Sequence, residues 1–241
     1  MARRKRLFIP GIPTHVYQRG NNKIPIFFSE KDYSLFLNML QEAKVKHPCL
    51  IYGYCLMPNH FHLLIEPEEK NNISLLMKFL GAKYVHYINK IHSRTGTLWE
   101  GRFKCSLVDR EAYFLTCLRY IELNPIRAGL VKSLALYKWS SYRARALGEK
   151  SKVLDLSKWY FDLGNDSFER QNRYKEFFRD YTIPEPAHLL IKEMLHKGGL
   201  TGDTKFKEQI EGILGRKILF RPQGRPFKEQ LNVQSGRSSS D

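Results

Sequence analysis

The 241-residue sequence lacks several features that would assign it to a familiar class. No apolar run approaches the roughly 18–20 residues that cross a membrane, and the apolar stretch behind the basic N-terminus is too short for a signal peptide. The four cysteines form no Cys-x-x-Cys pair, which disfavours a cysteine zinc site and fits reduced thiols. We therefore expect a cytoplasmic protein, associated with the nucleoid in a bacterium.

Acidic residues are fewer than basic ones. The chain has 24 Asp and Glu and 40 Lys and Arg, which gives a formal net charge of +16. Residues 1–150 hold 24 Lys and Arg against 11 Asp and Glu, whereas residues 151–241 hold 16 against 13. Such a surplus usually has a polyanionic partner, most often nucleic acid, although some basic proteins are only soluble enzymes. We expect the polyanion to bind mainly to the first 150 residues.

Apolar material is plentiful, with 42% hydrophobic and 13% aromatic residues, so the chain can bury a core. Strand patterns occur at residues 14–19, 50–57, 60–66 and 103–108. Helical spacing follows Ser29 to about residue 47, then spans 73–92, and then runs from Asp109 to about residue 124. This order predicts an α+β fold in which helices pack on a ferredoxin-like antiparallel sheet.

The chain changes character after about residue 148, where we place the end of the main domain, residues 1–148. Residues 149–220 are predicted to form a small helical extension, whose near-neutral charge favours a cap over a DNA-binding accessory. Residues 221–241 have little to bury and are predicted to be disordered. A single Gly-Arg-Pro triplet in that tail could be a minor-groove hook, but a plain linker is favoured.

The sharpest local motif is His60-Phe61-His62. Two histidines separated by one residue on a strand point to the same face, and Phe61 then points into the core. Paired imidazoles on a sheet can bind a metal ion, although the pattern also fits ordinary half-buried histidines. Glu66 shares this face but lies about 13 Å along the strand from His62, too far to share an ion.

The third predicted helix places a tyrosine and an amide together. Its core stripe comprises Phe114, Cys117, Leu118 and Ile121. Tyr113, Tyr120 and Asn124 lie on the flank of that stripe, and Tyr120 and Asn124 are one turn apart. The carbonyl oxygen of Asn124 can bind a hard cation. Tyr120 could equally be an ordinary tyrosine at the edge of the core.

These residues together resemble a known family. His60-Phe61-His62 resembles the HUH motif, two histidines flanking a hydrophobic residue. The segment Tyr-Ile-Glu-Leu-Asn-Pro-Ile-Arg-Ala-Gly-Leu-Val, residues 120–131, resembles the catalytic-helix signature of the REP-associated tyrosine transposases, relatives of the single-tyrosine HUH (insertion-sequence 200-like) transposases. Residues 99–103 and 139–142 are also similar to that family, and the resemblance covers about residues 8–145.

The resemblance implies an HUH endonuclease fold and a chemistry. Tyr120 would be the nucleophile that attacks a DNA phosphorus, forms a 5′-phosphotyrosine link and frees a 3′-OH. His60 and His62 would hold a divalent metal, Mg²⁺ or Mn²⁺, with Asn124 as a third ligand, directly or through a water. Tyr113, two turns earlier on the same face, is the alternative nucleophile.

The implied partner is single-stranded or hairpin DNA. Candidate contacts are Arg3 and Arg4 in the basic N-terminus, together with Arg19, Asn21, Arg102 and Lys104 beside predicted strands. The N-terminal arm could instead be a solvated segment without a partner. A monomer is favoured over the dimer that insertion-sequence relatives form.

Three other functions remain open. A domesticated protein could bind single-stranded or hairpin DNA without cutting it. Replication initiators and relaxases of the HUH type are larger and often carry a third histidine or paired tyrosines, which argues against them. A metal-dependent hydrolase that activates water would also use two histidines, but it would still work without Tyr120.

Overall fold

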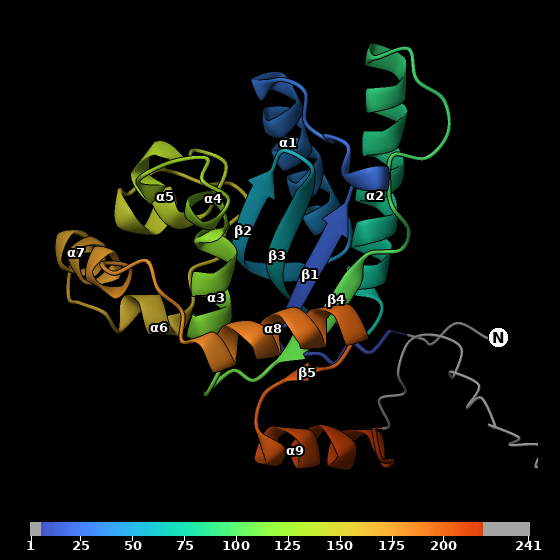
Figure 1. Cartoon of the computed structure of the whole chain (residues 1–241). Helices are drawn as coiled ribbons and strands as arrows, with labels where there is room; N and C mark the ends of the chain where they lie inside the picture. Colours follow the sequence, from blue (N-terminus) through green and yellow to red (C-terminus); the bar gives the residue numbers. More distant parts are fainter. Residues whose placement is uncertain (1–5, 219–241) are drawn as a thin grey trace, which may run out of the picture.

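The computed structural model describes residues 6–218, whose centre is a five-stranded sheet (Figure 1). The strands run in the order β2-β3-β1-β4-β5. Their bounds are β1 (Thr14–Arg19), β2 (Cys49–Met57), β3 (His60–Pro67), β4 (Lys104–Val108) and β5 (Leu200–Thr201). The first four pair antiparallel, and β5 pairs parallel to β4. The first four strands have the ferredoxin-like order, so the predicted α+β fold is confirmed.

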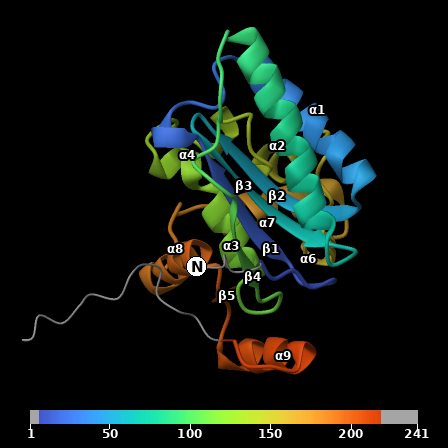
Figure 2. The same cartoon turned by 90° about the vertical axis from the view of Figure 1, so that its right-hand side faces the viewer.

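The helices lie on both faces of this sheet. They are α1 (Glu30–Lys46), α2 (Asn72–Ile91), α3 (Phe114–Glu122), α4 (Asn124–Arg127), α5 (Tyr142–Ala146), α6 (Lys158–Phe161), α7 (Ser167–Phe177), α8 (Glu185–Lys197) and α9 (Thr204–Leu214), with short 3-10 turns at Asn21–Lys23 and Leu134–Leu136. Helices α1 and α2 cover one face, and α3 and α8 lie on the other (Figure 2). None of the helices within residues 6–218 is long and apolar enough to cross a membrane.

Strand alternation sorts the side chains of β3 between the two faces, as expected. Phe61 and Leu63 are buried in the core beneath α1 and α2, so the two histidines of the motif face α3. The register of β1 against β3 pairs Tyr17 with His62 and Arg19 with His60. Because cross-strand partners share a face, β1 adds its own side chains to the histidine face.

The third helix starts later than its pattern predicts. Asp109 accepts hydrogen bonds from the backbone N–H groups of Glu111 and Ala112, which forms a separate turn before α3 begins. Aspartate side chains commonly compete with a helix in this way. Pro125 does not simply end the helix either. It occupies the first turn of the short helix α4, where a missing N–H costs little.

Helix α3 packs on β2 at Gly53. A Cβ atom at this position would overlap with the side chain of Leu118, which is fully buried on α3. The absence of a side chain therefore allows the core stripe of α3 to pack directly on the strand. This contact brings the flank of α3, which carries Tyr120, down onto the histidine face.

A buried ion pair anchors the far end of α3. Glu122 accepts a 3.1 Å hydrogen bond from Arg145 and a 2.6 Å hydrogen bond from Tyr174, and both charged side chains are fully buried. Ser141 also donates to Glu122, and Arg145 donates to a carbonyl of β2. The pair thus joins α3 to β2, to α5 and, through Tyr174, to α7 of the extension.

Replacing Arg145 with Ala should lower the free energy of unfolding by about 3–5 kcal/mol, because it leaves the Glu122 carboxylate buried without its cation. Denaturant unfolding followed by circular dichroism measures the loss. Arg173→Ala on α7 is the matched control, since that side chain is 59% exposed and pairs only with Glu169 on the surface. It should cost less than about 1 kcal/mol. Equal losses in both variants would contradict this account.

The extension also contributes to the sheet itself. Ile191 and Leu195 of α8 are buried, and Ile191 joins the core formed by α3 and the sheet. The helix ends at Gly198, whose positive φ of 65° suits a glycine cap. The chain then enters β5 and pairs with β4. This strand was not predicted, and the division at residue 148 stays a prediction.

Candidate active site

Five aromatic side chains meet on the face of the sheet that carries α3. The ring centroids of His60 and His62 are 5.2 Å apart, and Tyr17 of β1 lies 5.4 and 5.0 Å from them. His15 stacks on His62 at 5.0 Å. From α3, Tyr120 lies edge-on to both His15 and His62, at 5.7 and 5.8 Å. The predicted nucleophile and the predicted metal ligands are therefore neighbours.

Hydrogen bonds indicate which ring nitrogens of the histidine pair are available. The Nδ1 atom of His60 lies 2.6 Å from Oδ1 of Asn59, an acceptor, so Nδ1 carries the proton and Nε2 keeps a free lone pair. The Nδ1 atom of His62 lies 2.8 Å from Nε2 of His15. If His62 donates in this bond, its Nε2 also has a free lone pair, which is the tautomer that a metal requires.

His15 is a site residue that the sequence analysis missed. It is fully buried, and its Nδ1 has no hydrogen-bond partner among residues 6–218. A buried histidine that shares a hydrogen bond with a candidate ligand histidine restrains the orientation of that ring. The alternation of His15, Tyr17 and Arg19 along one strand was visible in the sequence. The sequence did not reveal the register of β1 against β3, which places these side chains beside the two histidines of the motif.

Burial keeps these imidazoles neutral. It lowers the pKa of His15 to about 3 and, helped by the nearby charge of Arg19, the pKa of His60 to about 4. The pKa of His62 is also far below its ordinary value, first through burial and then through its histidine neighbours. Neutral imidazoles have the lone pairs that metal ligation needs.

The two imidazoles are suitable ligands for a divalent metal ion, but two ligands alone do not fill the coordination sphere of such an ion. The ring centroids of His60 and His62 are 5.2 Å apart, and in the tautomer that frees both Nε2 atoms the two rings could share an ion. No group of three or more His, Cys, Asp or Glu side chains is placed to hold an ion within the described part of the chain. Asn124 donates from Nδ2 to the carbonyls of Tyr120 and Ile121, at 2.8 and 3.1 Å, which holds its amide at the end of α3. Its role as a ligand stays a prediction.

Tyr120 is enclosed on its other side. It is only 7% exposed, and burial raises its pKa, while the positive charge of Arg127 opposes that rise. The Arg127 guanidinium lies 5.4 Å from the centre of the Tyr120 ring. His188 of α8 stacks on the same ring at 5.6 Å. Tyr113, the alternative nucleophile, instead packs against the hydrophobic core between α3 and the sheet.

Comparison with known proteins assigns most of this site to one family. The sequence profile described as "Transposase IS200 like" matches residues 10–124, which include both histidines of the motif and Tyr120. Residues 10–124 are thus similar to the IS200-like transposases. The matched segment ends before Arg127 and before the whole of α8.

Two further proteins are similar to this chain, one in sequence and one in fold. A Haemophilus influenzae protein assigned to the REP-associated tyrosine transposases is 24% identical over 117 residues. That match covers 44% of this chain and 66% of the relative, so the chain spans just under two thirds of the relative's length. The solved structure of a REP-associated tyrosine transposase bound to a REP hairpin has a TM-score of 0.53 at 19% identity, and the match covers 65% of this chain and 96% of that one. At such identity the similarity concerns the fold.

Two predicted DNA contacts of the transposase domain lie on the histidine face. Arg19 and Lys104 flank Tyr17, since Lys104 pairs with it across the strands and Arg19 follows it by two residues. Arg19 forms two 2.7 Å hydrogen bonds with Glu100 at the surface, and Lys104 lies 2.8 Å from Nδ1 of His196. A phosphate would have to compete with these partners. Asn21 is half-buried just beyond β1, and Arg3 and Arg4 lie outside the described residues.

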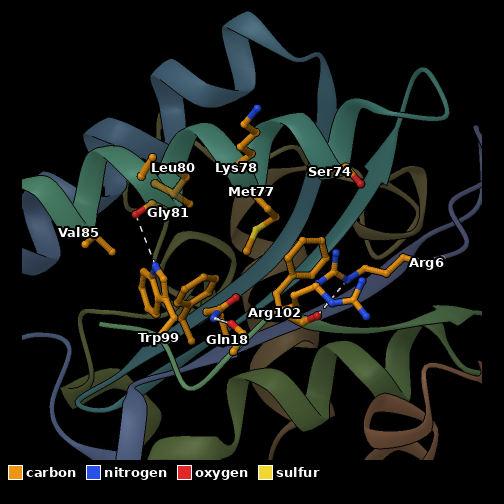
Figure 3. A pocket seen from close by; sticks show the side chains of 14 residues that line it. Arg6, Gln18, Ser74, Met77, Lys78, Leu80, Gly81, Val85, Trp99 and Arg102 are labelled. Atoms are coloured by element: carbon orange, nitrogen blue, oxygen red, sulfur yellow. Dashed lines mark hydrogen bonds between the residues drawn. The ribbon is translucent and has the colours of Figure 1, made fainter. Parts of the chain in front are cut away.

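Arg102 lies elsewhere. It lines a cavity of about 420 Å³ between α2 and the segment before β4, on the side of the sheet that faces α1 and α2 (Figure 3). Lys78 and Arg6 also line this cavity, whose wall includes Trp99. The structure therefore does not group Arg102 with the histidines, and any DNA contact through it would lie away from the nucleophile.

Replacing His15 with Ala should weaken binding of Mn²⁺ to the histidine pair by about 10- to 100-fold, because His62 loses the hydrogen-bond partner that orients it. Isothermal titration calorimetry of the purified protein measures the change. The control is His86→Ala, an exposed histidine on α2 that should leave the affinity unchanged. Unchanged affinity in both variants would show that His15 does not orient a ligand.

Proposed function

We propose that this chain is a tyrosine transposase that cleaves and rejoins DNA strands through a covalent link to Tyr120. The observation that carries the proposal is the edge-on packing of Tyr120 against His62, with their ring centroids 5.8 Å apart. A phosphate held by the histidine pair would lie within reach of this hydroxyl. The similarity of residues 10–124 to a transposase family supports the same conclusion.

The reaction is an exchange of esters. The hydroxyl of Tyr120 loses its proton to solvent, and its oxygen bonds to the phosphorus while the bond from phosphorus to the 3′ oxygen breaks. That 3′ oxygen takes up a proton and becomes a free hydroxyl, and the 5′ phosphate remains on the tyrosine. Rejoining reverses these steps with a 3′-OH end. Because one phosphodiester replaces another, no nucleotide cofactor is needed.

A phenol needs help to react, because its ordinary pKa is near 10. Arg127 provides positive charge beside Tyr120, which stabilises the phenolate both as attacking and as leaving group. His60 and His62 would hold a divalent ion, Mg²⁺ or Mn²⁺, which neutralises and orients the phosphate. Asn124 would supply a further oxygen to that ion. The rings of His15, His62 and His188 that pack around Tyr120 restrict the orientation of its ring.

The proposed substrate is single-stranded DNA beside a hairpin. The structural relative is a REP-associated tyrosine transposase bound to a REP hairpin, and hairpin recognition is carried over from it. The net charge of +16, concentrated in the first 150 residues, supports a polyanionic partner. Arg19 and Lys104 are the proposed phosphate contacts next to the active site, and Arg102 is a more distant one.

The test uses hairpin oligonucleotides from the DNA that flanks the gene, with the label at either end, incubated with Mn²⁺ or Mg²⁺ and resolved on denaturing gels. A 5′-phosphotyrosine link predicts that 3′-labelled strands shift to a protein adduct. The same reaction with 5′-labelled strands should release a shortened free fragment. Chelation with EDTA should stop both. Cleavage that leaves no adduct on either labelled strand would replace the proposal with a hydrolase.

A second function is favoured by one observation, the low exposure of Tyr120 behind His188. A chain that has lost strand cleavage could keep the sheet as a hairpin-binding surface, with the buried tyrosine as part of the core. Tight binding of the labelled hairpins without any cleavage, with either metal, would favour the non-cleaving hairpin-binding protein.

A further inference from the structure

Helix α8 is part of the active-site face, although it lies beyond the segment that matches the transposase family. It crosses the sheet beside α3 and in front of β1 and β4 (Figure 1). Buried Ile191 and Leu195 hold it there, and β5 follows it directly into the sheet. Apolar burial and strand pairing on the same side make α8 a fixed element of the site.

His188 is the residue through which α8 contacts the nucleophile. Its ring stacks on Tyr120, with an interplanar angle of 26°. Its Nε2 lies 2.5 Å from a guanidinium nitrogen of Arg127 and accepts that hydrogen bond. Its Nδ1 faces Glu185 at 3.6 Å, one turn earlier on the same helix. One side chain therefore contacts both the nucleophile and the cation beside it.

The protonation state of His188 suits this arrangement. Only a neutral imidazole can accept a hydrogen bond from arginine. Burial and then the charge of Arg127 lower the pKa of His188, while Glu185 opposes them. The neutral form with its proton on Nδ1 satisfies both neighbours at once.

We propose that His188 is a positioning residue for strand cleavage, which holds the Arg127 guanidinium against Tyr120 and so completes the active site from the C-terminal extension. This inference rests on the proposed function of Tyr120. Arg127 is exposed to solvent, so without His188 its flexible side chain would sample many orientations. Anchored through one nitrogen, it keeps other N–H groups free to bind an oxygen of the phosphate that Tyr120 attacks.

The first experiment separates binding from chemistry in the full-length protein. His188→Ala should leave hairpin affinity nearly unchanged and slow single-turnover adduct formation at saturating DNA by about 10- to 100-fold. His188→Gln should recover most of the rate, since its carbonyl oxygen can replace Nε2 as the acceptor. The control is Glu193→Ala, an exposed α8 residue that pairs only with Lys197 and should react like the wild type.

A second measurement does not depend on cleavage. In the wild type and in His188→Gln, the side-chain N–H signals of Arg127, assigned with Arg127→Lys, should be resolved in ¹⁵N NMR spectra because the guanidinium is held. In His188→Ala they should collapse to an averaged signal. If the wild type forms no adduct, the proposed function of Tyr120 fails, and the NMR spectra still decide whether His188 holds Arg127.

Two results would overturn the inference. One is a wild-type rate in His188→Ala together with unchanged Arg127 signals. The other is equal slowing in the Ala and Gln variants, which would indicate that the stacked imidazole matters only for packing. Thermal unfolding of each variant distinguishes that outcome from simple loss of the fold.

Discussion

Tyr120→Phe should abolish the covalent adduct and leave hairpin binding nearly unchanged. The change removes one oxygen and keeps the ring that packs against His15, His62 and His188, so the fold is retained. Without the hydroxyl no phosphotyrosine can form, and the rate should fall by on the order of 10⁴-fold or more. Denaturing gels with 3′-labelled hairpin strands measure the adduct, and gel-shift titration measures the binding.

Two other tyrosines serve as controls. Tyr113→Phe should form the adduct normally, because that half-buried residue packs against the hydrophobic core at the start of α3 and not against the histidine pair. Tyr17→Phe is the more demanding control, since Tyr17 lies closer to both histidines of the motif than Tyr120 lies to His62. An adduct that survives in Tyr120→Phe and disappears in Tyr17→Phe would move the nucleophile from the helix to β1.

His62→Asn should eliminate metal-dependent cleavage while preserving the local hydrogen bond. The amide of Asn can occupy the place of Nδ1 and keep the contact with His15, but it has no group at the position of Nε2. Since that nitrogen is the proposed ligand, we expect loss of Mn²⁺ binding in calorimetry and a fall in the adduct rate of at least about 10³-fold.

Two variants sharpen the test of the metal site. His60→Asn should have a similar effect, because His60 also uses Nδ1 for a structural hydrogen bond, to Asn59, and leaves Nε2 for the ion. His47→Ala, which removes a histidine at the end of α1, should change neither metal binding nor cleavage. If His62→Asn still cleaves with the same dependence on Mn²⁺, the ion lies elsewhere and the motif is structural.

The candidate active site combines residues of the segment that matches the transposase family with residues that follow this segment. Tyr120 and the histidine pair lie within residues 10–124, whereas Arg127 and His188 lie beyond them. Their contacts with Tyr120 are nevertheless as close as those of the histidines. A truncation before α8 would therefore alter the surroundings of the nucleophile as well as remove β5 from the sheet.

The sequence by itself determined the four antiparallel strands, the three helices among them and the faces of the strand and helix that carry the site. Strand alternation set His60 and His62 on one side and Phe61 on the other, and helical spacing set Tyr120 beside the core stripe of α3. These are local consequences of backbone geometry, with periods of two and 3.6 residues, so they need no knowledge of distant partners. Charge and the resemblance to transposases added two predictions, a polyanionic partner and Tyr120 as the nucleophile.

Only the tertiary structure decided what surrounds that nucleophile. His15 entered the site through the register of β1 against β3, and His188 entered through the docking of a helix some seventy residues away along the chain. The close approach of α3 depends on the missing side chain at Gly53. Such contacts depend on strand pairing and on packing between distant segments, and neither leaves a periodic signal in the segments themselves.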